Sequence, residues 1–116
     1  MKIKNRELQG IVDALFSISN HTSDIKCRWE LAKKSKAFVE ANDMLSLQIN
    51  RIIEEEGKLN DNKEKELSTD NKHYHELLNC EIDVNVTFAI EELEPYMPTM
   101  QELMKLQPII MESDMQ

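Results

Sequence analysis

The chain has 116 residues, of which 41% are hydrophobic and 31% are charged. This balance is typical of one folded domain over residues 1–116 and not of a disordered chain. No stretch approaches the roughly 18 apolar residues of a membrane span, and residues 1–10 lack the apolar core of a signal peptide. We therefore expect a cytoplasmic protein.

The net charge of −8 is distributed unevenly along the chain. Residues 1–36 contain eight Lys and Arg against four Asp and Glu, whereas residues 37–116 contain six against eighteen. Binding to nucleic acid over a wide surface requires clustered Lys and Arg, so the acidic majority disfavours it. The acidic part suits a basic partner protein or a groove that normally holds nucleic acid, and solubility alone also explains it.

The first residues predict a short strand followed by an amphipathic helix. The stretch MKIK is typical of an edge strand that presents Ile3, and Asn5 is a candidate N-cap. Residues 6–18 repeat apolar side chains at spacings of three and four, which predicts a helix with one buried stripe. Gly10 costs this helix up to ~1 kcal/mol relative to Ala, which suggests a close neighbour or a weak first turn. The stripe consists of Leu8, Ile11, Val12, Leu15 and Phe16.

Residues 23–56 predict a long helix, because they contain neither Pro nor Gly and Gly57 provides a stop. Its apolar side chains fall on two nearly opposite faces, and the change occurs near residues 36–42. The first face holds Ile25, Trp29, Ala32 and Val39, and the second holds Phe38, Leu45, Ile49, Ile52 and Ile53. A break near residues 36–42 and one straight helix with different neighbours at its two ends both explain this pattern. The lack of Pro and Gly favours the straight helix.

Residues 57–70 are polar and charged, which predicts an exposed loop. Thr69 or Asp70 is a candidate cap for a short helix that ends at Asn79. The predicted buried side of this helix consists of Tyr74, Leu77 and Leu78.

Residues 81–90 alternate apolar and polar side chains, which predicts an amphipathic strand. Its apolar face holds Ile82, Val84, Val86, Phe88 and Ile90. A strand needs a partner for its backbone groups. The candidates are residues 1–4, residues 89–94 after a turn, and the same strand of a second subunit.

The C-terminal part predicts a short helix. Thr99 and Glu102 have the spacing of a capping box, and Pro108 perturbs or ends the helix that follows. Its apolar side consists of Met100, Leu103, Met104 and Leu106. We therefore predict an α+β fold with a mainly helical N-terminal half built on one long helix, a small β-sheet around residues 81–90, and a short C-terminal helix.

The residues from His73 to Cys80 do not predict a metal or catalytic site. On a helix, His73 and His75 point about 200° apart and cannot bind one ion together. A buried Cys80 where the helix joins the strand explains that residue better than a catalytic Cys/His pair. Cys27 and Cys80 are expected to be free thiols. The sequence contains no GxSxG, HExxH, CxxC or Gly-rich phosphate loop, so we expect neither an enzyme nor a cofactor or metal.

Two groups of residues are candidates for binding. The first is basic with one aromatic residue, and it suits an acidic partner or a nucleic acid unless its lysines simply surround a buried tryptophan. It comprises Lys26, Arg28, Trp29, Lys33, Lys34 and Lys36. The second is a set of methionines, which pack adaptably at binding surfaces but also fill cores. It comprises Met97, Met100, Met104, Met111 and Met115, next to Tyr96.

Four stretches resemble a family of short proteins of unknown function that phages and prophages of Gram-positive bacteria encode. They are MKIKNRELQGIVDALFSI, KCRWELAKKSKAFVEA, NKHYHELLNCEIDVNVTFAIEEL and LMKLQPII. The N-terminal MKIKN with its helix and the join LLNCEIDVNV carry most of the resemblance. The middle loop is shorter and poorer in Gly than in that family. The resemblance implies a phage origin and no assigned activity, and it transfers no functional residues.

We therefore expect a non-enzymatic phage or prophage accessory protein that acts through protein–protein contact. It would be a virion or assembly component or a host-takeover factor, and its partner a phage structural protein or a host defence protein. The alternative is an inhibitor of a host antiviral defence system whose acidic surface mimics nucleic acid or blocks a basic groove. We expect it in the cytoplasm of the host bacterium, or associated with the virion.

The candidate partner-binding residues are Tyr96, Met97, Met100, Met104, Glu91, Glu92 and Glu94. A continuous acidic ridge that joins these glutamates to Glu81 and Asp83 would favour the inhibitor. Scattered acidic residues would favour the accessory protein that acts through ordinary protein–protein contact. A homodimer or an obligate protein partner is also expected, because the strand needs a neighbour and the long helix has two apolar faces.

Overall fold

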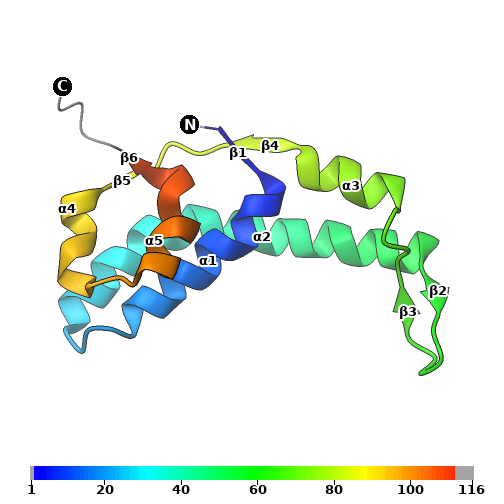
Figure 1. Cartoon of the computed structure of the whole chain (residues 1–116), viewed down its shortest axis with the longest axis horizontal. Coiled ribbons are helices and arrows are strands. Elements are labelled where there is room, and N and C mark those ends of the chain that lie inside the picture. The colour runs from blue at the N-terminus through cyan, green and yellow to red at the C-terminus, as the bar shows by residue number, and fades with distance from the viewer. Residues whose placement is uncertain (1, 112–116) are drawn as a thin grey trace.

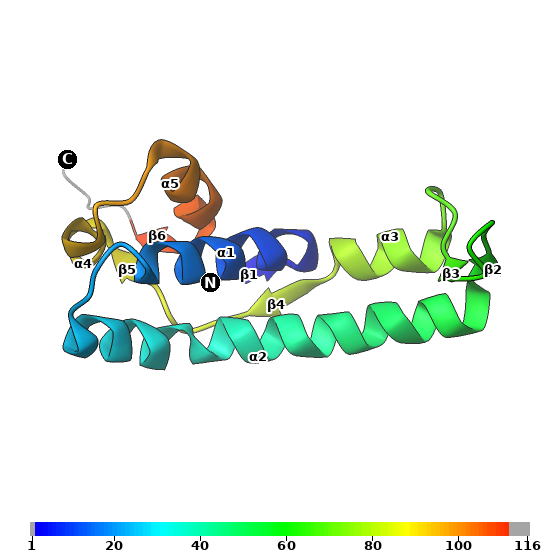
Figure 2. The ribbon, with the colours of Figure 1, turned by 90° about the horizontal axis from the view of Figure 1, so that it is seen from below.

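One helix of 32 residues, α2, extends along the molecule, and the other elements lie along one side of it (Figures 1 and 2). The computed structural model describes residues 2–111 and has an α+β fold. The elements in chain order are β1 (Lys2–Lys4), α1 (Asn5–Ser19), α2 (Ile25–Glu56), β2 (Lys58–Leu59), β3 (Lys65–Glu66), α3 (Lys72–Asn79), β4 (Glu81–Asp83), β5 (Phe88–Ala89), α4 (Ile90–Leu93), η1 (Glu94–Tyr96), α5 (Met100–Leu106), η2 (Gln107–Ile109) and β6 (Ile110–Met111).

The long helix α2 is unbroken, as predicted. It begins after Asp24, whose carboxylate accepts hydrogen bonds from the backbone N–H groups of Lys26 and Cys27. Its buried side chains recur at spacings of four and three, and they are Leu31, Ser35, Phe38, Asn42 and Leu45. The prediction of two buried faces is therefore wrong for the first face. Ile25 is 77% exposed and Trp29 is 62% exposed, because no other element covers that side of α2.

Helix α1 lies between α2 and α5 (Figure 2). Its predicted stripe is buried except for Phe16, which is 57% exposed. The prediction of Asn5 as the N-cap is also wrong. Lys4 occupies that position, and its backbone N–H donates to the Glu7 carboxylate. Asn5 is buried instead, and its side-chain amide donates to the Leu77 carbonyl, which attaches the start of α1 to α3.

Residues 81–90 do not form the one continuous strand that the alternation predicts. β4 pairs antiparallel with β1, with Ile3 opposite Ile82, and β5 pairs parallel with β6, with Phe88 opposite Ile110. The chain passes from one small sheet to the other between these strands (Figure 1). The pairing with the N-terminal residues is confirmed. Residues 90–93, proposed as part of another strand, form α4.

The predicted loop over residues 57–70 contains a short exposed antiparallel hairpin of β2 and β3. Helix α3 follows it and ends at Asn79 as predicted, but its N-cap is Asn71 and not Thr69 or Asp70. The predicted buried side of α3 is only partly buried. This end of the molecule therefore contributes little to the core.

Helix α5 begins with the predicted capping box, in which the Thr99 Oγ1 accepts from the Glu102 N–H and the Glu102 carboxylate accepts from the Thr99 N–H. The chain changes to the 3₁₀ helix η2 at Gln107, next to Pro108. Leu106 and Ile109 are fully buried. Among residues 2–111, no helix combines the length and the hydropathy that a membrane span needs.

Candidate functional site

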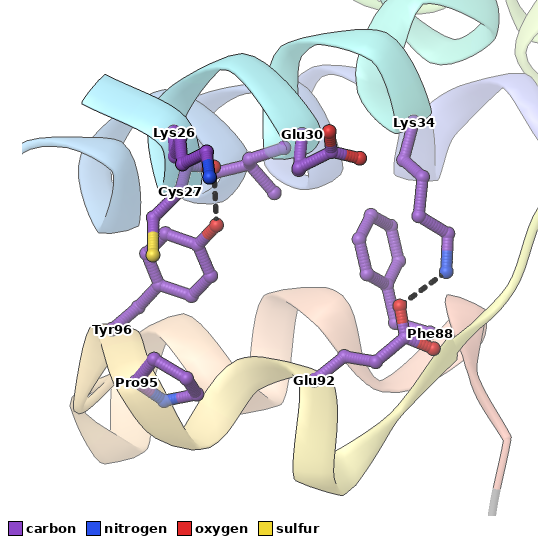
Figure 3. A pocket seen from close by; sticks show the side chains of 9 residues that line it. Lys26, Cys27, Glu30, Lys34, Phe88, Glu92, Pro95 and Tyr96 are labelled. Carbon is purple, nitrogen blue, oxygen red and sulfur yellow. Dashed lines mark hydrogen bonds and ion pairs between the residues drawn. The ribbon is translucent and has the colours of Figure 1, made fainter. Parts of the chain in front are cut away.

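A pocket of about 330 Å³ lies between the first turns of α2 and the segment formed by α4 and η1 (Figure 3). The Tyr96 ring enters it from η1, and the Tyr96 hydroxyl donates to the Cys27 carbonyl at 2.7 Å. Lys34 pairs with Glu92 at 2.5 Å and lies 4.4 Å from the centre of the Phe88 ring. These contacts connect α4 and η1 to α2.

The pocket does not contain an activated catalytic group. Burial raises the pKa of the Cys27 thiol, and the nearby charge of Asp24 and a hydrogen bond to it raise it further. The thiolate is the nucleophilic form, and a raised pKa keeps the Cys27 thiol mostly protonated at neutral pH. The hydrogen bond from Lys34 lowers the pKa of Glu92, which keeps the ion pair charged.

An open apolar groove lies between α1 and α2, and we call it the α1/α2 groove. Two adjoining hollows of about 520 and 240 Å³ share four lining residues. The groove is defined by Phe16, Trp29, Ala32, Ser35 and Val39. Two of these side chains, Phe16 and Trp29, are more than half exposed, although large aromatic side chains stabilise a protein most when they leave water.

The floor of the α1/α2 groove holds an unpartnered polar group. Ser35 is only 6% exposed, and its Oγ is the one buried side-chain N or O atom among the described residues without a hydrogen bond. A buried hydroxyl without a partner is costly, and most such groups are satisfied by a neighbour. The groove is therefore apolar around one site that needs a hydrogen-bonding group.

The charged side chains that line the α1/α2 groove are mostly basic, with Arg28, Lys33 and Lys36 against Glu40. Lys33 and Lys36 line it, and Lys33 Nζ lies 6.0 Å from the centre of the Trp29 ring. Their ion pairs, to Glu30 at 3.0 Å and to Glu40 at 3.8 Å, are exposed pairs along one helix, which are weak. Both lysines thus stay available to an acidic partner.

The structure separates the predicted partner-binding residues into two groups. Met97, Met100 and Met104 are 81%, 76% and 67% exposed, so they do not close the core. Tyr96 differs, because it is only 6% exposed and its hydroxyl is bonded to α2. Its side chain holds the fold together and is not part of a surface. Met111 is exposed as well, and Met115 lies outside the described residues.

The acidic candidates do not gather into one ridge. Glu91 and Glu94 are exposed, whereas Glu92 pairs with Lys34 and also accepts a hydrogen bond from the Ala89 N–H. In the other sheet, Glu81 lies opposite Lys4 and Asp83 opposite Lys2, so lysines offset these charges. β4 and α4 also lie at different places along the molecule (Figure 1).

Histidine and cysteine residues serve structural roles. On α3, His73 contacts the Glu56 carboxylate while His75 contacts the Thr69 carbonyl, so the two rings have separate partners. Cys80, predicted to be buried, is exposed and donates its S–H to the Glu76 carbonyl. Both cysteines are free. In residues 2–111, no three His, Cys, Asp or Glu side chains gather as a metal site would require.

A polar cluster between α1 and α5 was not predicted. The buried Glu102 carboxylate accepts a hydrogen bond from Ser17 Oγ and lies 3.1 Å from His21 Nε2, while His21 Nδ1 lies 2.8 Å from the Tyr96 carbonyl. Burial opposes ionisation of Glu102, but the hydrogen bonds from Ser17 and Thr99 and the nearby His21 outweigh it and lower its pKa. Ser17 bonds to the carboxylate and not to the imidazole.

Sequence reasoning recognised Trp29 but not the groove around it. The signal was present, since α2 carries apolar side chains on two faces and a 116-residue chain has few elements to cover both. Ser35 gave no signal, because a serine in a helix is usually exposed.

The comparisons yielded no relative: models of protein families, curated proteins and solved structures gave no significant match to this chain.

Proposed function

We propose that this protein is a non-enzymatic accessory protein of a phage or prophage that acts by binding another protein through the α1/α2 groove. The observation that carries the proposal is the groove itself, in which the rings of Phe16 and Trp29 remain more than half exposed above the unpartnered Ser35 hydroxyl. Exposed aromatic side chains that flank a depression are the usual anchors of protein interfaces.

One further feature is consistent with binding. In the pocket beside α4, the pKa of the Cys27 thiol is raised and Glu92 is held in an ion pair with Lys34, so neither is an ionised nucleophile or a free base. The assignment to a phage rests on the resemblance of the sequence to short phage and prophage proteins. It gives the protein a role as a virion or assembly component or as a host-takeover factor.

The alternative, an inhibitor that presents an acidic surface in place of nucleic acid, has less support. Such mimicry needs a row of uncompensated negative charges. Here Glu92 is paired with Lys34, and Glu81 and Asp83 lie opposite lysines. Of the five candidate acidic residues, Glu91 and Glu94 are the two that are exposed and that neither pair with a lysine nor lie opposite one.

The test is capture of the partner from infected bacterial cells, followed by reconstitution. Tagged wild-type protein and the variants Trp29→Ala and Leu47→Ala are compared, because Leu47 is 66% exposed on the same helix but does not line the groove. The captured protein is then produced alone, and its affinity is measured by calorimetry. We expect Trp29→Ala to weaken binding by about 10-fold or more and Leu47→Ala to leave it unchanged.

Equal affinities for wild-type protein and Trp29→Ala, with both folded by circular dichroism, would refute the groove as the binding surface. A captured partner that is a nucleic-acid-binding defence enzyme, with binding lost on Glu91→Lys/Glu94→Lys and retained on Trp29→Ala, would favour the inhibitor instead.

A further inference from the structure

We infer that a second copy of this chain binds in the α1/α2 groove and that it does so head to tail. The segment that enters the groove is the α4–α5 region of the second copy, from Ile90 to Leu106, with Met97, Met100 and Met104 as apolar contacts and Glu91 and Glu94 as the charged ones. This inference rests on the proposed function in taking the groove as a binding surface, and a second copy and another protein would compete for the same groove.

The groove favours an occupant that is apolar and acidic. Residues 25–36 contain five Lys and Arg against one Glu. The charged residues that line the groove are the basic Arg28 and the acidic Glu40, together with Lys33 and Lys36. These two lysines are the candidate contacts for a carboxylate. Their side chains are 51% and 75% exposed. A carboxylate placed beside them would be attracted without displacing a buried ion pair, because Glu30 and Glu40 hold them only through exposed contacts.

The α4–α5 region has the complementary character. Residues 90–104 contain four Glu and no Lys or Arg. Three exposed methionines follow one another along this segment, at 81%, 76% and 67% exposure for Met97, Met100 and Met104. Methionine side chains are flexible and fill irregular depressions, and their sulfur atoms make favourable contacts with aromatic rings such as those of Phe16 and Trp29.

The two surfaces of one molecule cannot meet each other. Helix α1 lies between α2 and α5 in Figure 2, and α5 is attached to α1 by the Ser17–Glu102 hydrogen bond and by the buried Leu106. The two complementary surfaces are held apart within one molecule, so their complementarity can act only between copies. The contact is heterologous, so each added copy leaves one free groove and one free methionine segment, and assembly continues until the rotation closes a ring or a filament forms.

The test uses sedimentation velocity of the full chain over a range of protein concentrations at low and high salt. We expect the average mass of the wild-type protein to rise with concentration beyond that of a dimer and to fall when salt screens the charges. Lys33→Glu/Lys36→Glu and Glu91→Lys/Glu94→Lys should each be monomeric. An equimolar mixture of the two variants should associate again. The groove of the first variant is now acidic and meets the basic segment of the second, and the native basic groove of the second meets the native acidic segment of the first.

The matched control is Lys63→Glu/Lys72→Glu, which makes the same change in net charge at the hairpin and α3 and should assemble like the wild-type protein. Circular dichroism of each variant establishes that it is folded.

Three results would overturn the inference. One is a monomeric wild-type protein at every concentration, and another is a mixture of variants that stays monomeric. The third is an assembly that Lys33→Glu/Lys36→Glu dissolves but Glu91→Lys/Glu94→Lys does not, which would mean that two grooves face each other. A monomeric protein whose captured partner still depends on Trp29 would refute self-association while leaving the proposed function intact.

Discussion

The two ends of α2 are surrounded very differently. The first part of the helix lies against α1, and its buried side chains Leu31, Phe38 and Leu45 belong to the core. Towards its end, Ile52 and Ile53 are only half-buried. The elements that accompany this end are the hairpin β2–β3 and α3, and no residue within Lys72–Asn79 of α3 is buried (Figure 1).

Polar contacts dominate at the far end. Lys65 pairs with Glu54 at 3.5 Å, Arg51 with Glu55 at 3.3 Å, and His73 lies 2.7 Å from Glu56, all on exposed side chains. Exposed pairs of this kind contribute about 0–1 kcal/mol each, far less than buried apolar side chains. The helix α2 is therefore continuous in structure but consists of two regions that differ in stability. We call the region packed against α1 the core half, and we expect the other half to open more easily.

Shortening a core side chain of α2 should produce the largest effect. Phe38 is fully buried, so Phe38→Ala should destabilise the protein by about 3–5 kcal/mol through lost burial and a new cavity. Ile53→Ala, in the half-buried far part, should cost only about 1 kcal/mol. Urea denaturation followed by circular dichroism measures both. Equal losses for the two variants would contradict the division of α2 into two energetic regions.

The comparison also separates what the sequence predicted from what it did not. The Thr99–Glu102 capping box and the length of α2 were predicted correctly, because neighbours along the chain decide both. The pairing of residues 1–4 with β4 was predicted because Ile3 and the alternating run had few other partners.

The wrong predictions share a different cause. Each concerned a strand or a helix face whose surroundings depend on a segment that is distant in the sequence. Alternation reports which side chains face the core, and it stayed largely correct through Val84 and Phe88. It does not report which strand pairs with which. The change of partner within residues 81–90, from β1 for β4 to β6 for β5, was therefore missed. Periodicity likewise predicts an apolar face but not whether a neighbour covers it. For this reason Trp29 and Phe16 were expected in the core and are exposed.

A pH titration should distinguish the two ends through their carboxylates. Glu102 lies on α5, at the end of the molecule that holds the core half of α2. Its hydrogen bonds outweigh its burial and lower its pKa below the ordinary 4.5. A lowered pKa in the folded state stabilises the protein above the pKa of the unfolded state, and this stabilisation is lost as pH falls through the folded value. Glu102→Gln should therefore cost about 1–2 kcal/mol at pH 7, and the difference from wild type should shrink below about pH 4.5.

Glu56 provides the matched carboxylate at the far end. Hydrogen bonds from His73 and Asn71 lower its pKa as well, but its surroundings are exposed. Glu56→Gln should change stability less than Glu102→Gln at every pH, as measured by thermal melts from pH 3 to 8. A larger loss for Glu56→Gln would show that the α3 end is more tightly coupled to α2 than the burial of its side chains implies.

Replacing a glycine in α1, which packs against the core half of α2, should raise stability by a smaller amount. Gly10 lies inside α1, and a Cβ built there meets only the flexible Lys105 side chain, at 3.9 Å. Gly10→Ala should therefore raise stability by about 0.4–1 kcal/mol, because alanine restricts the unfolded chain and favours the helix. The close neighbour that the sequence suggested imposes no clash. A lower melting temperature for Gly10→Ala would mean that α5 sits closer to α1 than this distance indicates.

Ser35→Ala should have the smallest effect, and its sign matters more than its size. The Ser35 hydroxyl is buried without a hydrogen bond on the floor of the α1/α2 groove. Removing an unsatisfied group eliminates a desolvation cost, and alanine is the better helix former, so the isolated protein should gain about 0.5 kcal/mol. If the hydroxyl bonds to an occupant of the groove, the same variant should weaken that binding while it raises the melting temperature. A destabilised Ser35→Ala would instead show that the hydroxyl is hydrogen-bonded in the free protein, and that the core half of α2 is complete without an occupant in the groove.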